Sequence, residues 1–424
     1  MTKISQLFFF VLMLSGIIFG QHDSLTLNEC VDIALKNNPQ MKLAESNYDY
    51  NYSNVVITRS NLFPQIFMGA GWARNGGTFF QGPASFQRTF ATYNAGFQGS
   101  LLITDFGKTY SKLSGFSDLA DASSQDVVNA RQSLILNTYI AYFSYLQAVR
   151  LEKVSIESLT QATEHLKLSK SLYDVGRSPQ FDVIKAESDE ATARVNLINA
   201  ENNIEINRLQ FENILNIKLT PGFPLKDEFE IVRDSISDSN YLDIALQKRP
   251  EVIASKYRVE ANKSFVTSAW TANLPTISGT AGYNWKSFNI AGVYPESWSL
   301  GLTISLPIFQ GFALDAGIQQ ARANLDIAQS TYDLTVQAVT LDVRQQFSNL
   351  RLAQNQISAA KSLLKTAEET LRLAEARFKE EIGSAVEVTD ARVGYYNAQV
   401  LMIQSLYNYQ VNYARLQRAM GILK

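Results

Sequence analysis

The chain has 424 residues, enough for two or three globular domains, and its 38 basic residues nearly balance its 40 acidic ones. This balance excludes the strongly basic surface of a nucleic-acid-binding protein, so no nucleic-acid partner is expected. A single cysteine, Cys30, excludes an internal disulfide, and we interpret it as a small apolar residue of a helix. The two histidines, His22 and His165, are too few for a Cys/His metal site, and His165 is expected on a helix surface.

The first twenty residues resemble a secretory signal peptide. Lys3 precedes an apolar run over residues 7–15, and the small residue Gly20 stands before Gln21. We therefore expect a signal peptide over residues 1–20 that is cleaved before Gln21. The apolar run is short for a membrane span, which makes a retained anchor the weaker alternative. No later segment is apolar over the roughly 18 residues that a spanning helix needs, so none is expected in the mature chain.

The rest of the chain is a tandem duplication. The segment Asp32–Met41 recurs as Asp243–Val252, and the same offset aligns Pro64 with Pro275. Matches at this spacing indicate two copies of one structural unit, far longer than the repeats of solenoid proteins. We expect a first repeat over residues 21–217, an inter-repeat linker over 218–238 and a second repeat over 239–424.

Each repeat predicts the same elements in the same order. A short helix ends before a proline that opens a second helix, and two strands, a long helix, a tight turn and a returning helix follow. In the two repeats the expected ranges are 26–36 and 239–248 for the short helix, 107–174 and 311–382 for the long helix, and 180–217 and 385–420 for the returning helix. The last long helix would be roughly 105 Å long. The second and returning helices, stacked end to end, would nearly match it, with the linker as a belt near mid-height.

Apolar residues of the last long helix recur at steps of three and four, which predicts coiled-coil packing. The stripe comprises Ile357, Ala360, Leu364, Ala367, Leu371, Ala374 and Phe378, and it resumes after Gly383 at Ala391, Tyr395, Ala398, Met402, Ser405 and Tyr409. The long and returning helices should therefore form an antiparallel hairpin that reverses at Gly383. Gly176 is the corresponding residue of the first repeat, and both glycines are expected in the left-handed conformation.

The four expected strands alternate between apolar residues and small or polar ones. The apolar faces comprise Ile66, Met68, Ala70 and Trp72 in the first and shortest strand, Tyr93, Ala95, Phe97, Gly99, Leu101 and Ile103 in the second, Ile277, Gly279, Ala281, Tyr283 and Trp285 in the third, and Trp298, Leu300, Leu302, Ile304, Leu306 and Ile308 in the fourth. Such alternation also fits a sheet packed on a soluble core. Because the helices are already committed to coiled coils, we favour lipid contact, with strands of about ten residues in an outer-membrane barrel.

Four strands cannot close a barrel, and open edges are not tolerated in a bilayer, so the chain is expected to oligomerise through its strands. Two copies would supply eight strands, and three would supply twelve with room for an aqueous lumen.

At this point the chain resembles the TolC-type outer-membrane efflux proteins. The resemblance is carried, across both repeats, by residues 27–35 with Asn38-Pro39, residues 61–64 before a strand, residues 306–311 before the long helix, and residues 383–391 at the far turn. It implies an α+β membrane protein in which four transmembrane β-strands per chain complete a trimeric, 12-stranded barrel, continued by a long antiparallel α-helical coiled-coil barrel in the periplasm.

The resemblance also implies a function without catalysis or cofactors. The chain would be the outer-membrane exit duct of a tripartite efflux pump, working with an inner-membrane transporter and a periplasmic adaptor. A type I protein secretion duct is the alternative within the family. A soluble periplasmic coiled-coil adaptor or scaffold is the alternative from another class, although it leaves the strands unexplained. The sequence shows no Ser/His/Asp order, phosphate-binding glycine loop or metal-spaced His or Glu residues, so we expect no enzyme.

The resemblance places candidate functional residues at the two helix turns, where members of the family close at rest and dock the adaptor. The matching positions are Val175, Gly176, Arg177 and Ser178 in the first turn, and Ile382, Gly383, Ser384 and Ala385 in the second. The first turn departs from the family pattern because it carries Ser178-Pro179, which makes it two residues longer. Acidic residues often ring the family's aperture, and Glu375, Glu380 and Glu381 lie in that region, with solvated surface charge as the alternative.

Overall fold

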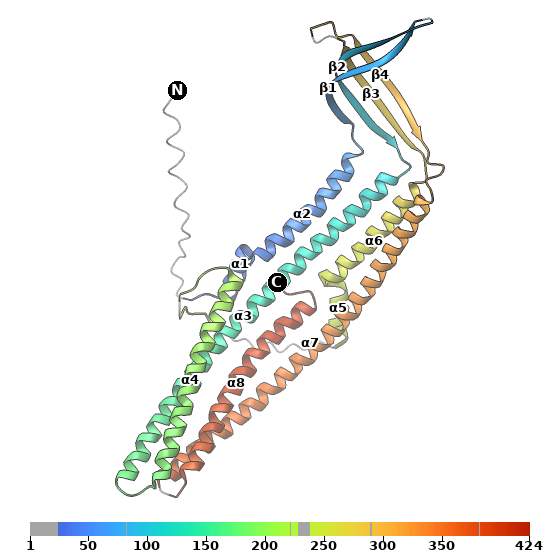
Figure 1. Ribbon diagram of the computed structural model, residues 1–424. Coiled ribbons are helices and arrows are strands. Elements are labelled where there is room, and N and C mark those ends of the chain that lie inside the picture. Colours follow the sequence, from blue (N-terminus) through green and yellow to red (C-terminus); the bar gives the residue numbers. More distant parts are fainter. Residues whose placement is uncertain (1–23, 82, 221, 228–237, 289–290, 381) are drawn as a thin grey trace, which may run out of the picture.

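The computed structural model describes residues 24–81, 83–220, 222–227, 238–288, 291–380 and 382–424. The expected signal peptide, His22 and Glu381 lie outside the described residues. The elements are α1 (Leu27–Asn37), α2 (Pro39–Ser60), β1 (Gln65–Gln81), β2 (Ala84–Thr104), α3 (Lys108–Asp174), α4 (Gln180–Leu215), α5 (Asp238–Lys248), α6 (Pro250–Thr271), β3 (Thr276–Ser287), β4 (Glu296–Ser305), α7 (Ala313–Lys379) and α8 (Ala385–Ala419). They form an elongated helical body with one sheet at its end (Figure 1).

The two halves of the molecule have matching elements, which confirms the tandem-duplicated architecture. The helices α1 and α5 have 11 residues each, and α2 and α6 have 22 each. The long helices α3 and α7 have 67 residues each, while the returning helices α4 and α8 have 36 and 35. The helix α7 is slightly shorter than the predicted range 311–382 because Gly311 and Phe312 are both in the left-handed conformation before it begins.

Local signals fix where the helices start. Thr26 and Glu29 form a reciprocal capping box at α1. Pro39 and Pro250 occupy the first turns of α2 and α6, where the missing N–H of proline has no consequence. Each long helix follows a left-handed pair, Phe106-Gly107 before α3 and its counterpart before α7. A bulky residue at positive φ is rare, so its recurrence marks the sharp strand-to-helix turn as part of the repeated unit.

The second and returning helices meet end to end along each long helix, as predicted (Figure 1). In the first half, the side-chain amide of Asn38 donates to the carbonyl of Ile214 at 2.9 Å, and Asn216 donates to the carbonyl of Asn37 at 3.1 Å. In the second half, Gly421 at the end of α8 packs so tightly against the α5–α6 junction that an added Cβ would lie 2.8 Å from the Lys248 backbone. Both junctions lie near mid-height.

The described part of the linker forms a belt at the same level. Leu225 forms a parallel β-bridge with Leu25, and the hydroxyl of Tyr142 on α3 donates to the carbonyl of Leu25. Arg150 on α3 donates to Asp227 at 2.8 Å, which fixes the linker to the helical body. A large apolar cluster fills this region and includes Leu134, Tyr142, Phe143, Leu146, Phe211 and Leu215.

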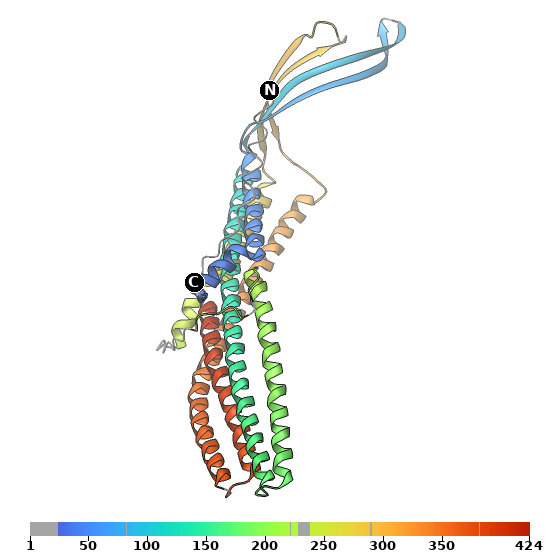
Figure 2. The same ribbon diagram turned by 90° about the vertical axis from the view of Figure 1, so that its left-hand side faces the viewer.

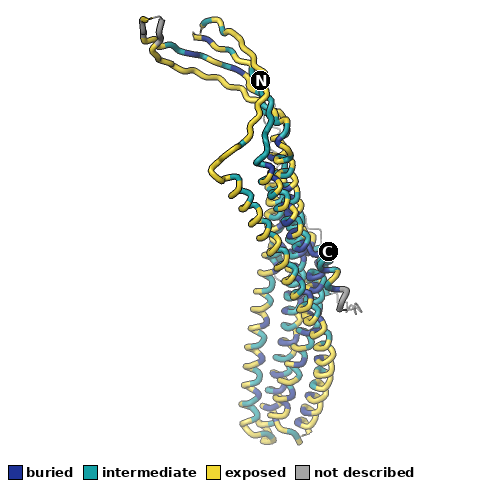
Figure 3. The backbone as a smooth tube through the Cα atoms, turned by 90° about the vertical axis from the view of Figure 1, so that its right-hand side faces the viewer, coloured by how far each residue is buried: buried dark blue, intermediate teal, exposed yellow. Residues whose placement is uncertain are grey.

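The predicted coiled-coil stripes are confirmed. Ala360, Leu371, Ala374 and Phe378 of α7 are buried, and the remaining stripe residues of α7 are half-buried. All six predicted positions of α8 are likewise buried or half-buried. Buried residues lie along the helical body, whereas the strands are mostly exposed (Figure 3). Among the described residues, no helix combines the length and apolarity needed to cross a membrane.

The sheet is antiparallel with the order β1-β2-β3-β4, and it confirms the predicted faces. One row of paired residues runs Met68–Phe97–Tyr283–Trp298, so the apolar positions of all four strands share one face. Every residue of β4 is exposed, and no described helix covers the sheet (Figures 1 and 2). The outer edges of β1 and β4 have no partner strand within the described chain.

The strand lengths required corrections. The predicted ten residues hold for β4, but β1 has 17 residues and β2 has 21, so the first strand is not the shortest. Their ladder continues from the Gln65–Ser100 pair to the Gln81–Ala84 pair, and the glycines in β1 hid its alternation. This hairpin therefore extends beyond β3 and β4 (Figure 2). The strand β4 ends at Ser305, so Leu306 and Ile308 belong to the connection into α7.

Candidate functional site at the tip of the helical hairpins

The two helix turns lie side by side at the end of the molecule opposite the sheet (Figures 1 and 2). The connection between α3 and α4 covers Val175–Pro179, and the connection between α7 and α8 covers residues 380–384. Both connections therefore have five residues, so the first turn is not the longer of the two within this chain. Helices of 67 residues place these turns roughly 100 Å from the strands.

The first turn depends on Gly176, which is left-handed with a φ of 74° as predicted. Its N–H bonds to the carbonyl of Tyr173, and the N–H of Arg177 bonds to the carbonyl of Leu172, both at 2.8 Å. These bonds satisfy carbonyls at the end of α3 that would otherwise lack helical partners. The hydroxyl of Ser178 donates to Asp182 at 2.6 Å and anchors the start of α4.

The second turn uses its glycine differently, and the prediction for Gly383 was wrong. The positive-φ glycines do not include Gly383. A Cβ at this position would instead lie 3.0 Å from the Cβ of Arg377 and 3.1 Å from the backbone nitrogen of Phe378. The close approach of the α7 backbone therefore favours glycine here, and Ser384 completes the turn by capping α8 through the N–H of Glu387 at 3.2 Å.

The eight predicted tip residues differ in how accessible they are. Val175 is 67% exposed and Ile382 is 69% exposed, and each presents an apolar side chain at the end of the molecule. The other exposed positions are Gly176, Arg177 and Ser384, whereas Ser178 and Gly383 are half-buried. Ala385 is buried in the apolar cluster beneath the turn, so it supports the tip and presents no side chain at the surface.

Of the predicted acidic residues, Glu375 and Glu380 lie among the described residues and have different surroundings. Glu375 accepts from Arg392 of α8 at 2.9 Å. Glu380 is exposed, and its backbone N–H bonds to the carbonyl of Ala376 at the end of α7. The structure therefore gives Glu375 a fixed partner on the neighbouring helix.

Sequence reasoning missed a polar layer between the two hairpins, close behind the turns. The hydroxyl of Thr389 on α8 donates to Asp189 on α4, which also accepts from Lys185 at 2.7 Å. The prediction that His165 lies on a helix surface was wrong, because its exposed fraction is only 4%. The heptad spacing of α3 held a signal for this burial. Ala162 and Ser169 lie seven residues apart on the packed side of the helix, and His165 lies between them on the same side.

The electrostatics of this layer centre on His165. Burial is the main cause of a pKa for His165 that is lowered to about 4, and the guanidinium of Arg392 contributes to the same shift. The carboxylates of Asp189, Glu375 and Asp182 act in the opposite direction. The imidazole is therefore neutral at physiological pH, and its ring packs against Phe378 at a centroid distance of 5.1 Å.

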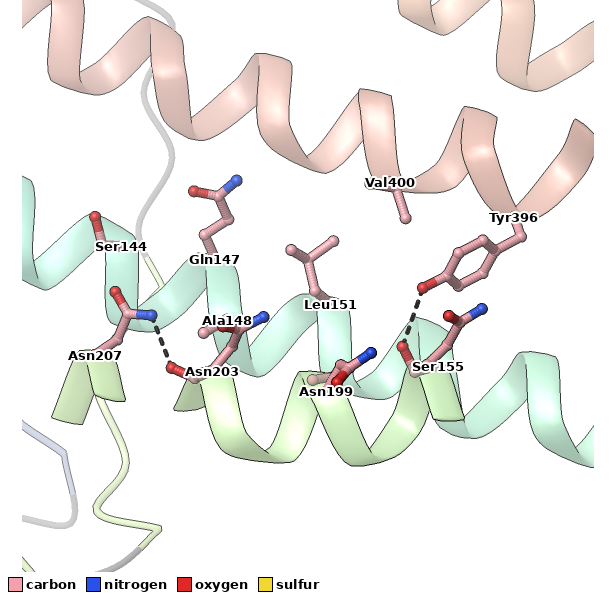
Figure 4. A pocket seen from close by; sticks show the side chains of 12 residues that line it. Ser144, Gln147, Ala148, Leu151, Ser155, Asn199, Asn203, Asn207, Tyr396 and Val400 are labelled. Carbon is pink, nitrogen blue, oxygen red and sulfur yellow. Dashed lines mark hydrogen bonds between the residues drawn. The ribbon is translucent and has the colours of Figure 1, made fainter. Parts of the chain in front are cut away.

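Farther from the tip, a polar groove of about 340 Å³ lies on the α3–α4 hairpin beside α8 (Figure 4). Its lining comes from α3, α4 and α8 and is rich in amides and hydroxyls, namely Ser144, Gln147, Ser155, Asn196, Asn199, Asn203, Asn207 and Tyr396. No charged side chain lines it, and its one described bond between the hairpins joins Ser155 and Tyr396 at 3.4 Å. The groove therefore gives this stretch of the helical wall a polar surface where α3, α4 and α8 meet.

Comparison with known proteins is consistent with this architecture. The sequence profile described as "Outer membrane efflux protein" matches residues 30–216 and 241–422, so it covers both repeats. The chain belongs to the outer membrane efflux protein family. This efflux protein is 25% identical to the outer membrane protein TolC of Escherichia coli over 412 residues, which cover 91% of the chain and 80% of TolC.

Other relatives and solved structures support the same assignment. The toluene efflux pump outer membrane protein TtgC of Pseudomonas putida is 24% identical over 413 residues, covering 94% of this efflux protein and 83% of TtgC. The outer-membrane channel OprN shares the fold with a TM-score of 0.85 at 20% identity, covering 93% and 89% of the two chains. The Campylobacter jejuni CmeC outer membrane channel shares the fold with a TM-score of 0.84 at 22% identity, covering 93% of this chain and 85% of CmeC.

These findings confirm the predicted fold, location and general function. The protein is an outer-membrane efflux protein with a TolC-like channel fold, and it serves as an exit duct. The alternative of a soluble periplasmic adaptor is thereby excluded. Because the chain is an outer-membrane channel, the uncovered apolar face of its sheet is the face that meets lipid.

Proposed function

We propose that the protein is the trimeric, non-catalytic outer-membrane component of a tripartite efflux pump, with its helix turns as the docking tip for a periplasmic adaptor. The observation that carries this proposal is an open-edged, uncovered four-stranded sheet at one end of two 67-residue helices, with both turns at the other. The inner-membrane transporter would load the duct, which spans the periplasm and adds no chemistry of its own.

Three copies fit the open sheet best. The edges of β1 and β4 carry backbone groups that need partners in the bilayer. Pairing β4 of one copy with β1 of the next makes a closed ring, and three copies give twelve strands. Eight strands from two copies would leave an interior filled by side chains, whereas twelve leave a water-filled lumen suited to export.

The helices support the same assembly. Ile327, Leu334 and Leu341 of α7 recur every seven residues, and each is more than half exposed in the single chain. A seven-residue apolar repeat is the pattern of a helix seam, and this one has no described partner within the chain. A neighbouring copy would bury the seam and continue the helical wall around the lumen.

The adaptor surface is proposed to extend from the tip along α7 and α8. Exposed Val175 and Ile382 give the tip an apolar contact surface. A groove of about 610 Å³ continues between α7 and α8 and combines Leu363 and Leu373 with the charged residues Arg377, Glu387 and Asp390. An apolar strip flanked by both signs of charge suits an amphipathic helix of a partner.

We further propose that the mature chain starts at Gln21 and consists of the repeats 21–217 and 239–424, joined by the linker 218–238. The matching helix lengths in the two halves and the belt contacts of Leu225 and Asp227 support this division.

The test replaces both exposed tip residues in a Val175→Asp, Ile382→Asp double variant. A strain that depends on this protein for efflux would be assayed for dye export and for trimer abundance in the outer membrane. Export should fall at least tenfold while trimer abundance stays near the wild-type level, because neither side chain contributes to the packed core.

Val293→Asp is the matched control, because Val293 is 87% exposed in the loop between β3 and β4, at the other end of the molecule. It receives the same Val→Asp substitution as Val175, which adds one of the two charges of the tip variant, and it should leave export unchanged. Full export by the tip variant at normal trimer level would reject the tip as the docking surface. Loss of trimer in proportion to export would assign these residues a structural role only.

A further inference from the structure

We propose that the contact between the two hairpins behind the tip is acid-sensitive, and that a proton taken up by His165 separates α3–α4 from α7–α8 and opens the duct. The inference rests on the proposed function, because it takes the turns as the closed end of the duct. It adds a regulatory group that belongs to neither the turns nor the acidic residues discussed above.

His165 lies where all four long and returning helices meet. It belongs to α3, its ring contacts Phe378 of α7, and it is 4% exposed. The charged groups that face it are Arg392 from α8, Glu375 from α7, and Asp182 and Asp189 from α4. A charge gained by the imidazole would therefore act on groups of both hairpins.

The pocket contains polar atoms that the packed arrangement leaves without partners. The Nε2 atom of His165, the hydroxyl of Ser169 and the Nη1 atom of Arg392 are buried and make no hydrogen bond among the described residues. A buried polar atom without a partner destabilises the packed state relative to an open, hydrated one. These three atoms therefore count against the closed contact.

The nearby carboxylates are occupied, so they cannot readily compensate a new charge. Asp189 accepts from Lys185 and Thr389, and Glu375 accepts from Arg392. Protonation would turn the Nε2 atom of His165 into a donor without an acceptor and would place a second cation beside Arg392. Both effects disfavour the packed arrangement.

The difference in proton affinity between the closed and open contacts gives the direction and the size of the pH dependence. Burial and Arg392 lower the pKa of His165 to about 4 in the closed contact, whereas an exposed histidine has a pKa of about 6.5. Because the closed form binds its proton less tightly, its stability is complete above about pH 6.5 and falls as the pH drops toward 4. Between about pH 7.5 and 4.5 the ratio of open to closed contacts should rise by up to about 70-fold per protomer.

At this level the hairpins are joined by the packing of Leu172 and His165 on the Phe378 cluster and by few described hydrogen bonds. The Thr389–Asp189 bond crosses between them, and beyond the layer begins the neutral groove with its single Ser155–Tyr396 bond (Figure 4). Separation would therefore break few described hydrogen bonds, and the exposure of Phe378 and Leu172 would be its main cost.

The experiment records the conductance of purified trimers in planar lipid bilayers at about pH 7.5 and about pH 4.5. Wild type should show a large acid-induced rise in open probability. His165→Gln, which is polar and cannot be protonated, should lose most of that rise, although it keeps every carboxylate. His165→Arg, which is charged at all pH values, should already be open at neutral pH.

An undiminished acid response in His165→Gln would overturn the inference, since the carboxylates alone would then account for it. If His165→Arg does not assemble, the comparison of wild type with His165→Gln decides the matter by itself. Failure of the proposed function would look different, because wild-type trimers would then conduct at neither pH and support no export in cells.

A direct titration gives an independent check. The sequence has only two histidines, so histidine-selective isotope labelling of a His22→Gln background reports on His165 alone. Magnetic resonance of the closed protein should give a pKa more than two units below that of a free histidine. An ordinary pKa near 6.5 would overturn the inference.

Discussion

At the scale of single residues, three glycines meet three different backbone requirements. Gly176 has positive φ and open space around its Cβ position, Gly383 has ordinary φ and crowded space, and Gly421 has both positive φ and crowding. The sequence identifies each as a break after a helix, but it cannot distinguish these causes, because crowding is set by segments distant in the chain.

Gly421 should therefore be the least replaceable of the three. An alanine there would suffer left-handed strain of about 1–2 kcal/mol, and its Cβ would lie 2.8 Å from the backbone of Lys248. We expect Gly421→Ala to lower the midpoint of thermal unfolding, followed by circular dichroism of the helices in detergent, by several degrees.

Gly317→Ala is the control for this measurement. Gly317 lies inside α7 with nothing within 4 Å of its Cβ position, so alanine should stabilise the helix by about 0.5–1 kcal/mol. Equal midpoints for the two variants would contradict the tight contact between α8 and the α5–α6 junction.

His165 shows the limit of sequence reasoning at the same scale. A lone histidine in a helical sequence is ordinarily expected on the surface. The burial of His165 follows only from the approach of α7 and α8 to α3. The tip residues Val175 and Ile382 could be placed from the two turns, whereas Ala385 could not be assigned to the buried cluster without the packing of α7 beneath it.

At the scale of elements, helices were easier to predict than strands. The absence of proline after Pro307 and the heptad stripe were enough to place α7 and α8 within a few residues. The strand β1 was predicted too short because Gly76 and Gly77 carry no side chain to continue the alternation. Its true length is determined by pairing with β2, which is a contact between segments and not a local property.

The register of the sheet makes a sharp prediction about β4. Leu302 pairs with Gly279 on the apolar face, while the next residue, Thr303, pairs with Ser278 on the other. Leu302→Arg should cost about 2–4 kcal/mol of membrane stability near the bilayer midplane, because its charge would face lipid. Thr303→Arg should be tolerated, since it would face the water-filled interior. Outer-membrane levels of each variant after detergent extraction provide the measurement, and equal levels would show that the faces are assigned wrongly.

At the scale of the whole molecule, the sequence predicted the architecture because duplication, coiled-coil spacing and strand alternation all pointed to it independently. It could not reveal the polar groove beside α8 or the polar layer that joins the hairpins. Those features arise where α4 and α8 come together, 200 residues apart in the chain between Asp189 and Thr389. The same reasoning extends from one chain to the assembly, where surfaces that remain uncovered indicate what must cover them.

The exposed seam on α7 provides the test of that assembly. Leu334 lies in the middle of the stripe formed with Ile327 and Leu341, and it is 64% exposed in the single chain. If a second copy buries it, Leu334→Glu places a charge inside a helix interface and should convert trimers to monomers, whereas Gln329→Glu on the opposite side of the same helix should not. The mass of each variant in detergent distinguishes the two states. Both substitutions introduce a carboxylate at an exposed position of one helix. A loss of trimer in both variants would therefore report on the stability of the helix, whereas a loss in Leu334→Glu alone would report on assembly. A Leu334→Glu protein that remains fully trimeric would mean that the copies meet through their strands alone and that the stripe on α7 faces solvent or another partner.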